Sequence, residues 1–335
     1  MNRPQRLNVA FDAGHLLERG TDVALFDYAL GNEELLGNRS FILCPARANL
    51  VALDKFRARF TVLLYRDRDD LRLWLEPMDV YYVQDHGKRP QWEVPRPPHG
   101  RTVVHCVFEC KEPHGDVYAA ISSWVALHRG LDGGQPCPVV PYMVWLPQVE
   151  GDLRAELGIP AGATVLGRHG GASTFDLPFV HAEVRAAVLA RDDLWFVFLN
   201  TAAFCEPHPR IVHLPATFDL ARKTKFVQTC DAMLHARHEG ETFGLACAEF
   251  SIRHKPVITW LGSKDRFHVE CLGQKGLYYR GADDLRRILH GFRPVTGDFD
   301  AYSARFGPEP VMAQFERVFL LPQPAAKSSP ALAAR

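Results

Sequence analysis

The chain has 335 residues, of which 47% are hydrophobic and 23% are charged, and its 39 basic residues balance its 39 acidic ones. This balance excludes the strong positive field expected of a nucleic-acid-binding protein. No stretch approaches the roughly 20 apolar residues of a membrane span or the apolar core of a signal peptide. We therefore expect a globular protein of the cytoplasm, long enough for two domains.

Short apolar runs alternate with segments of helical length along the whole chain. The runs of the first half are LNVAF, SFILC, FTVLLY, VYYV, TVVHCVF and VYAAIS, and those of the second half are TVLGR, WFVFL, IVHL, AMLH and PVITW. Spacers such as GTDVALFDYALGNEELL and FDLPFVHAEVRAAVLAR have the length of helices. This alternation predicts parallel strands buried on both faces, and hence an α/β fold with doubly wound sheets.

The alternation breaks once, where prolines and glycines surround the segment DLRAELG, which we expect to form a short helix. We predict a Rossmann-like N-terminal domain over residues 1–148 and a second one over residues 149–307, facing each other across a cleft. A C-terminal helix is expected over residues 308–320. The tail, residues 321–335, is small, proline-rich and typical of disorder.

The stretch HEGETFGLACAEF carries two acids, Glu241 and Glu249, eight positions apart. TFGLACAEFSIRHK is predicted to be a helix, so that Glu241 lies in the loop before it and Glu249 about one and a half turns inside it. Gly244 would leave backbone N–H groups open to a phosphate, and the carboxylate of Glu249 suits a ribose diol. The alternative is an ordinary helix with one acid at its N-terminus and one solvated acid.

This stretch resembles the E-x7-E signature of retaining glycosyltransferases with the GT-B fold, above all those of family 4, in which two glutamates and a Phe-Gly-Leu turn bind a nucleotide sugar. The segments LRAELGIPAGATVLGR, CDAMLHARHEGE and FSIRHKPVIT also look like the corresponding parts of the family's donor domain. The resemblance covers about Leu153 to Leu289. It implies a hexosyltransferase of the EC 2.4 type that moves a hexose-type sugar to a hydroxyl of a glycan, a lipid or a small molecule.

The resemblance also implies roles for residues of the donor domain. Glu241 matches the first glutamate of the family, expected near the hydroxyls of the donor sugar, and Glu249 matches the second, expected on the nucleotide ribose. Phe243, Gly244 and Leu245 match the turn whose backbone approaches the phosphate and the sugar.

Arg168, in LGRHGG, matches the basic residue that holds the diphosphate and stabilises the leaving group. Members of the family usually carry a lysine a few residues later, and this chain does not. In its place the loop offers His169, Ser173, Thr174 and the backbone N–H groups of Gly170 and Gly171. We expect the glycine-rich backbone and the hydroxyls to bind the anion at a helix start, the alternative being a weakened site.

The N-terminal half resembles the family less closely. Gly20 and Thr21 stand where the family has a glycine-rich loop that faces the phosphates, although Thr21 or Asp22 would equally serve as an ordinary helix cap. His105, at the end of the run TVVHC, matches a histidine that the family often places near the transferred sugar. A lone histidine at a strand end is more often structural, and this alternative stays open.

Neither a metal nor a cofactor is expected. The 8 cysteines include no C-x-x-C pair and are predicted to be free, mostly buried thiols. The histidines have no recurring metal-ligand spacing, and the family needs no metal.

Two other functions compete with glycosyl transfer. The missing lysine would fit a non-catalytic GT-B-like module or subunit that binds a nucleotide sugar. A dinucleotide-dependent oxidoreductase would need G-x-G-x-x-G after the first strand, and FDAGHLLERG does not supply it. The expected partners are a nucleotide-sugar donor and a hydroxyl acceptor, with no nucleic acid, while a peripheral contact with a membrane and the oligomeric state stay open.

Overall fold

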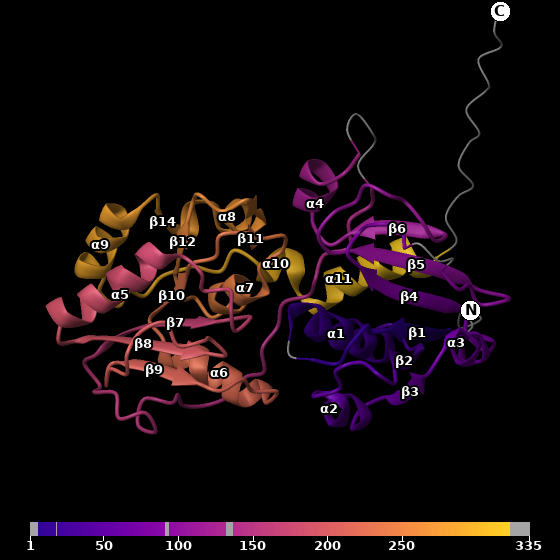
Figure 1. The fold of residues 1–335 in the computed structure, drawn as a ribbon, viewed down its shortest axis with the longest axis horizontal. Coiled ribbons are helices and arrows are strands. Elements are labelled where there is room, and N and C mark those ends of the chain that lie inside the picture. The colour runs from indigo at the N-terminus through magenta and orange to yellow at the C-terminus, as the bar shows by residue number, and fades with distance from the viewer. Residues whose placement is uncertain (1–5, 18, 91–93, 132–136, 322–335) are drawn as a thin grey trace, which may run out of the picture.

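The computed structural model describes residues 6–17, 19–90, 94–131 and 137–321, and it folds them into two lobes (Figure 1). Apart from Leu321, the tail predicted to be disordered lies outside the described residues. Each lobe is built on a six-stranded sheet whose strands all pair in parallel. Helices cover the sheets in both lobes, so each sheet has two buried faces.

The first sheet has the strand order β3-β2-β1-β4-β5-β6. Its strands are β1 (Asn8–Asp12), β2 (Arg39–Pro45), β3 (Thr61–Tyr65), β4 (Val80–Asp85), β5 (Arg101–Cys106) and β6 (Val117–Ala120). Its helices are α1 (Gly20–Glu34), α2 (Leu53–Arg57), α3 (Arg68–Leu75) and α4 (Ser123–His128).

The second sheet repeats this winding, with the order β14-β12-β10-β7-β8-β9, and a two-stranded sheet of β11 and β13 lies beside it. The strands are β7 (Thr164–His169), β8 (Leu194–Leu199), β9 (Ile211–Leu214), β10 (Ala232–His235), β11 (Gly240–Glu241), β12 (Val257–Trp260), β13 (Asp265–Arg266) and β14 (Gly276–Tyr279). The helices are α5 (Pro178–Ala190), α6 (Leu220–Thr229), α7 (Leu245–Ser251), α8 (Phe267–Leu272), the 3₁₀ turn η1 (Gly273–Lys275) and α9 (Ala282–Gly291).

The apolar runs named from the sequence all form strands, namely β1 to β10 and β12. They are buried as expected of parallel strands covered on both faces: Val9, Ala10 and Phe11 of β1, for example, have no exposed surface. The prediction of an α/β fold with two doubly wound sheets is therefore confirmed.

One predicted helix does not form. The segment DLRAELG is a series of turns between Gly151 and Gly158, which have φ angles of 77° and 65°. The left-handed backbone at these two glycines cannot continue a right-handed helix in either direction. The residues between them are too few to form a stable helix alone. The side chain of Arg154 instead donates to the carbonyl oxygen of Ala163 and to Asp231.

The last described residues return to the first lobe after the chain has passed through the second (Figure 1). After α10 (Ser303–Phe306), the helix α11 (Pro308–Phe315) and the π-helical turn η2 (Glu316–Leu320) lie against the first sheet. The ring of Phe315 lies 5.1 Å from that of Tyr28 and 5.5 Å from that of Tyr82, centroid to centroid. The core of the first lobe is thus completed by residues from the far end of the sequence.

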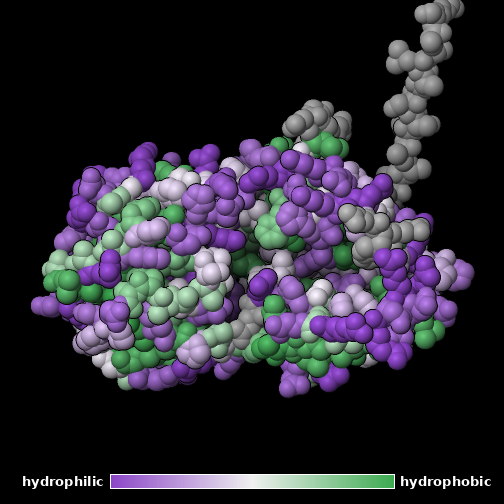
Figure 2. All heavy atoms as spheres, viewed as in Figure 1, coloured by the Kyte–Doolittle hydropathy of each residue, from purple (hydrophilic) through white to green (hydrophobic). Residues whose placement is uncertain are grey.

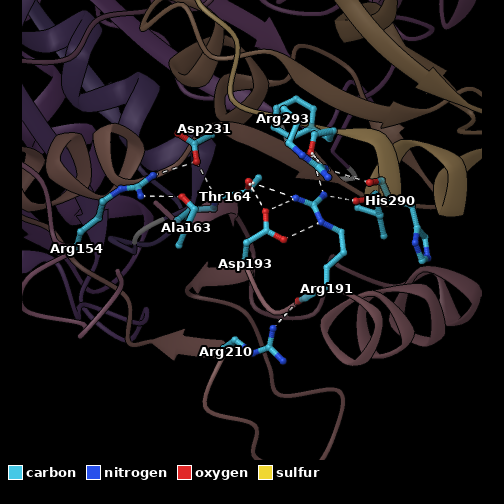
Figure 3. Close-up of polar contacts among 12 residues, drawn as sticks. Arg154, Ala163, Thr164, Arg191, Asp193, Arg210, Asp231, His290 and Arg293 are labelled. Atoms are coloured by element: carbon cyan, nitrogen blue, oxygen red, sulfur yellow. Dashed lines mark hydrogen bonds and ion pairs between the residues drawn. The ribbon is translucent and has the colours of Figure 1, made fainter. Parts of the chain in front are cut away.

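A polar network ties together the amino edge of the second sheet (Figure 3). The guanidinium of Arg191 donates to the carbonyl oxygens of Leu289 and Phe292 at 2.6 and 2.9 Å and pairs with Asp193 at 2.6 Å. Asp231 accepts from Arg154 and from the backbone of Val165. These contacts brace the strands at the edge opposite to the site described below.

The carboxyl ends of the strands face the region between the lobes, where the face shown in Figure 2 is recessed. In both sheets the strand order reverses once, between β1 and β4 in the first and between β7 and β10 in the second. In doubly wound sheets such a switch point leaves a crevice at the carboxyl edge that binds ligands. The topology therefore places a candidate site at the ends of β7 and β10.

The prediction that the cysteines are free thiols is wrong for one pair. Cys110 and Cys137 form a disulfide across a sequence separation of 27 residues, and the other six cysteines, all within the described ranges, are free. No sequence motif marks this pair, because the two cysteines approach each other only in the folded chain, where Cys110 forms a β-bridge with Gly130. Within the same ranges no helix has both the length and the apolar character needed to cross a bilayer.

Candidate functional site

Two of the predicted residues, Glu241 and Arg168, lie at the switch point of the second sheet. Arg168 and His169 end β7, His235 ends β10, and Glu241 follows in the short strand β11. Because the carboxyl ends of β7 and β10 are neighbours at the crevice, their side chains enter one region. Glu249, in α7, completes the set from the adjacent helix.

The carboxylate of Glu241 is held from two sides. His235 Nε2 lies 3.2 Å from its Oε1, and Arg237 donates to its Oε2 at 3.1 Å. Burial alone would raise the pKa of Glu241, but the hydrogen bond with His235 and the charge of Arg237 outweigh it and hold the pKa at about 2. Glu241 is therefore an oriented anion at neutral pH.

The ring of His235 is oriented in turn by other buried groups. Its Nδ1 lies 2.9 Å from the hydroxyl of Thr259, and that hydroxyl lies 3.0 Å from Nε2 of His268. Burial lowers the pKa of His268 to about 3, so this ring is neutral. A chain of side chains from β12 and α8 thus fixes the direction in which Glu241 points.

Arg168 is buried, and loop groups accept three hydrogen bonds from its guanidinium. It donates to the hydroxyls of Thr201 and Thr174, both at 2.5 Å, and to the carbonyl oxygen of Gly171 at 3.2 Å. Burial lowers the pKa of Arg168 to about 10, while the charge of Glu241 acts to raise it. Arg168 therefore remains a cation at neutral pH within the electrostatic range of Glu241.

The loop after β7 differs from the expectation of an anion site at a helix start. The helix α5 begins only at Pro178, so Ser173 and Thr174 lie in the loop before it, at a turn, and Ser173 is exposed. Thr174 is engaged with Arg168 and Gly171. Gly170 has a φ of 150°, and a Cβ on it would lie 2.9 Å from Nη2 of Arg168. Gly170, Gly171 and Thr174 thus shape the pocket of Arg168.

The turn of Phe243, Gly244 and Leu245 lies at the start of α7, later than the predicted helix start because Gly244 has a left-handed φ of 90°. A Cβ at Gly244 would lie 3.0 Å from that of His268. The side chain of Phe243 is buried and packs 5.4 Å from the ring of Tyr142, a residue before the second lobe begins. Phe243 therefore joins the lobes, and its own side chain is not available to a ligand.

Glu249 is not a solvated acid. Its carboxylate is buried, with Lys223 Nζ of α6 2.5 Å from Oε1 and His169 Nε2 2.9 Å from Oε2. Burial would raise the pKa of Glu249, but the charge of Lys223 and the contact with His169 hold it at about 2. The structure therefore supplies, from another helix, an ammonium group that the loop after β7 lacks.

The first lobe adds an acid to this cluster. Asp27 of α1 is buried and interacts electrostatically with both Lys223 and Glu249. Burial raises the pKa of Asp27 to about 7, against the hydrogen bond of Trp145 and the attraction of Lys223. The charges around Glu249 thus include groups from both lobes.

Gly20 and Thr21 open α1, and Gly20 faces the second lobe. A Cβ on Gly20 would lie 3.5 Å from Cδ1 of Leu245, so α1 begins directly opposite the turn at Gly244. Thr21 and Asp22 do not act as the helix cap, because the cap position is Arg19 and its side chain makes no capping bond. Asp22 is buried and lies 2.9 Å from Nδ1 of His15.

His105 is not part of this site. Its ring is fully buried, with Nδ1 2.7 Å from the hydroxyl of Tyr82 and Nε2 2.8 Å from the carbonyl oxygen of Val140. Burial lowers its pKa to about 3. With both nitrogens occupied inside the aromatic core, His105 cannot reach a sugar, and the expectation that it lies beside the transferred group is corrected.

Sequence reasoning missed Arg237 and Lys223. Arg237 follows the strand AMLH at the carboxyl edge, so its position two residues after a strand end was a usable signal. Lys223 carries no such signal, because its contact with Glu249 depends on how α6 packs against α7. Within the described ranges, no group of three or more potential metal ligands clusters together.

No protein-family model and no curated protein matches the chain, whereas solved structures match its fold. HepE from Anabaena, in complex with UDP-glucose, is 13% identical with a TM-score of 0.72, covering 93% of this chain and 99% of HepE. AviGT4, a glycosyltransferase involved in avilamycin A biosynthesis, is 16% identical with a TM-score of 0.62, covering 93% of this chain and 97% of AviGT4. A Listeria monocytogenes protein proposed to be a UDP-N-acetylglucosamine 2-epimerase is 13% identical with a TM-score of 0.54, covering 92% and 94%.

These likenesses extend over both lobes, and they show the fold. The chain has the GT-B fold, two Rossmann-like domains facing each other across a cleft, as predicted from the sequence. The fold alone does not assign an activity, because one fold carries different chemistries.

Proposed function

We propose that this protein is a glycosyltransferase that moves a sugar from a nucleotide-sugar donor to a hydroxyl group of an acceptor. The observation that carries the proposal is the oriented anion Glu241 beside two cations, Arg168 and Arg237, at the switch point of the second sheet. A carboxylate can accept hydrogen bonds from sugar hydroxyls, and guanidinium groups suit a diphosphate. UDP-glucose bound to HepE, which shares the fold, supports a UDP-sugar donor.

Each group then has a defined task. Arg237, with 28% of its side chain exposed, would contact the diphosphate directly, and the buried charge of Arg168 would add to the field that stabilises the departing nucleotide. The backbone at Gly244, which has no side chain to obstruct it, would approach the phosphate. Lys223 would supply the positive charge that the loop after β7 lacks.

Glu249 would contact the ribose in this proposal, once Lys223 moves from its Oε1 to a donor phosphate. The acceptor would bind on the side of the first domain, across from Glu241, where Gly20 and Thr21 begin α1. We also propose that the sugar keeps its anomeric configuration. Because His235 and Arg237 both bind the carboxylate of Glu241, this acid is poorly suited to act as a covalent nucleophile. The acceptor hydroxyl would instead attack from the face that the nucleotide leaves, while the bond between the anomeric carbon and the phosphate breaks and the hydroxyl proton passes to the departing phosphate oxygen. No step requires a metal.

The test is a binding and turnover screen of the purified protein against UDP, GDP, dTDP and their glucose conjugates. We expect one nucleotide to raise the melting temperature, and we expect slow release of that nucleotide from its sugar conjugate. The Arg237→Ala variant should lose both effects. NMR of the product of an accepted substrate would give its anomeric configuration. Binding without any release favours the non-catalytic module, and an epimerised sugar nucleotide with no transfer favours an epimerase.

A further inference from the structure

We propose that Trp124 and Arg129 of the first domain are positioning residues for Glu241, acting through Asp265 of the second domain. This inference rests on the proposed function in so far as Glu241 contacts the donor. Neither Trp124 nor Arg129 touches the proposed donor region directly. Their effect is transmitted through a short ladder of backbone hydrogen bonds.

The contact between the domains is polar, charged and mostly buried. Trp124 Nε1 donates to Asp265 Oδ1 at 2.8 Å, and Arg129 Nε donates to the same oxygen at 3.0 Å. Trp124 and Asp265 are each 8% exposed. The guanidinium of Arg266 also lies 5.8 Å from the centre of the Trp124 ring. A buried carboxylate with these donors keeps its position only while the two domains stay together.

Asp265 is joined directly to the segment that carries Glu241. In the pairing of β11 with β13, Asp265 lies opposite Gly240 and Arg266 lies opposite Glu241. The backbone N–H of Asp265 donates to the carbonyl oxygen of Glu239 at 2.8 Å. The two strands have two residues each and no other strand partner, so they depend on contacts from outside the ladder.

Two further contacts make this ladder rigid. The hydroxyl of Ser263 donates to the carbonyl oxygen of Arg237 at 2.9 Å, so the same segment also holds the second residue that binds the carboxylate of Glu241. Gly240 approaches so closely that a Cβ on it would lie 2.0 Å from the carbonyl oxygen of Asp265. A displacement of Asp265 is therefore passed on to Arg237 and Glu241 together.

The contact of Asp265 with Trp124 and Arg129 lies where it would respond to opening and closure of the two domains. α4 lies beside β11 and α8 on one side of the junction between the lobes, while the chain crosses between them near α10 (Figure 1). If the domains part about these crossings, the bonds of Asp265 to Trp124 and Arg129 break. The donor acid is then held in its working orientation only in the closed arrangement, which couples domain closure to the site.

The test of this contact, which we call the Asp265 clamp and which consists of Trp124, Arg129 and Asp265, uses the full chain and three variants: Trp124→Phe, Asp265→Ala and the double variant. Arg286→Gln is the matched control, because it removes a charge-assisted contact with Glu183 at 2.6 Å within the second domain. The first readout is hydrogen exchange of the backbone amides of residues 237–241 and 263–266. The second is the rate of UDP release from UDP-glucose beside the affinity for UDP alone.

We expect exchange in both segments to speed up about 10-fold or more in each clamp variant, with β7 and β8 unchanged, as a lost hydrogen bond to a charged group implies. The double variant should be no worse than the more affected single variant, because both lose one shared interaction. The kcat should fall while the affinity for UDP changes less than threefold. Asp265→Ala removes the acceptor and retains the Trp124 side chain, so it stays informative if Trp124→Phe folds poorly.

Two results would overturn the inference: exchange in residues 237–241 equal to that of the Arg286→Gln control, or single effects that simply add in the double variant. A wild-type protein that neither binds UDP nor uses any of the sugar conjugates would contradict the proposed function. The exchange measurement would still decide whether the clamp holds the segment of Glu241.

Discussion

Lys223 Nζ lies 2.5 Å from Glu249 Oε1, although the two residues belong to different helices and only 12% and 5% of their side chains are exposed. A pair this well buried behaves differently from a surface ion pair. Removing one partner leaves an uncompensated charge in the interior, whereas removing both does not. This asymmetry gives a direct test of the charge cluster around Glu249.

We predict that Lys223→Met lowers the free energy of unfolding at pH 7 by about 3 kcal/mol, as measured by urea denaturation. Adding Glu249→Gln should recover at least half of that loss, because the carboxylate that lacks a partner is gone. Lys264→Met is the control, since Lys264 pairs with Glu239 on the surface at 2.6 Å and its loss should cost less than about 1 kcal/mol. Equal losses in the two lysine variants would contradict the buried cluster.

A second prediction concerns the pH dependence that Asp27 causes. Its pKa is about 7 in the folded protein, because of burial, and near 3.9 in an unfolded chain. Between these values the folded protein holds a proton that the unfolded chain has released, so this group lowers stability as the pH rises from 4 to 7. Asp27→Asn removes the effect, and we expect the variant to gain about 2 kcal/mol relative to the wild type between pH 5 and pH 8.

The measurement is the difference in unfolding free energy between the variant and the wild type at each pH, which cancels the contributions of all other groups. Asp192→Asn serves as the control, because the side chain of Asp192 is exposed and lies outside the buried charge cluster around Glu249. A difference for Asp27→Asn that does not change with pH would mean that Asp27 is ionised in the folded protein throughout this range.

The third prediction separates two neighbouring glutamates. Glu241→Gln removes the negative charge at the proposed donor site, and we expect it to lower kcat/KM for the accepted nucleotide sugar by roughly 10- to 100-fold, as for a lost hydrogen bond to a charged group. Glu239→Gln, two residues away and exposed beside Lys264, should stay within about twofold of the wild type. Steady-state kinetics of the two variants, measured in parallel, would check this prediction. Equal kcat/KM values for the two variants would show that Glu241 is not part of the donor site.

The fourth prediction concerns Gly240, where φ is 73° and a Cβ would lie 2.0 Å from the carbonyl oxygen of Asp265. Gly240→Ala should destabilise the protein by about 2 kcal/mol or more, because both the backbone conformation and the ladder are disturbed. Gly281→Ala should be nearly neutral, since nothing lies within 4 Å of the added atom. The measurement is the melting temperature of each variant in thermal unfolding. Similar melting temperatures would show that β11 and β13 accommodate the added methyl group without a loss of stability.

The parts of this structure that follow from local pattern could be predicted from the sequence. Apolar runs of strand length gave both sheets, and the spacing of Glu241 and Glu249 located the segment after β10. The role of His105 could not be read in this way. Its position at a strand end is local information, but its burial depends on rings such as Phe319, which lies 5.2 Å away and enters from η2.

The contacts of Glu249 could not be predicted from the sequence for the same reason. The helical pattern placed it inside α7, yet its partners come from α6 and from the end of β7, and Asp27 comes from the other domain. The turns at DLRAELG show the opposite case, in which the left-handed Gly151 and Gly158 override residues that favour a helix. Long-range packing and backbone conformation at glycines are what a single sequence does not display.

The return of α11 and η2 to the first sheet has a consequence for synthesis on the ribosome. Phe315 and Phe319 pack against rings of the first domain, including Phe11 and Tyr82, and they are made only after the whole second domain. The aromatic face of the first domain therefore stays uncovered until the second domain has been translated. The nascent chain carries an exposed apolar surface throughout that interval, and a chain cut at the boundary between the domains would carry it permanently.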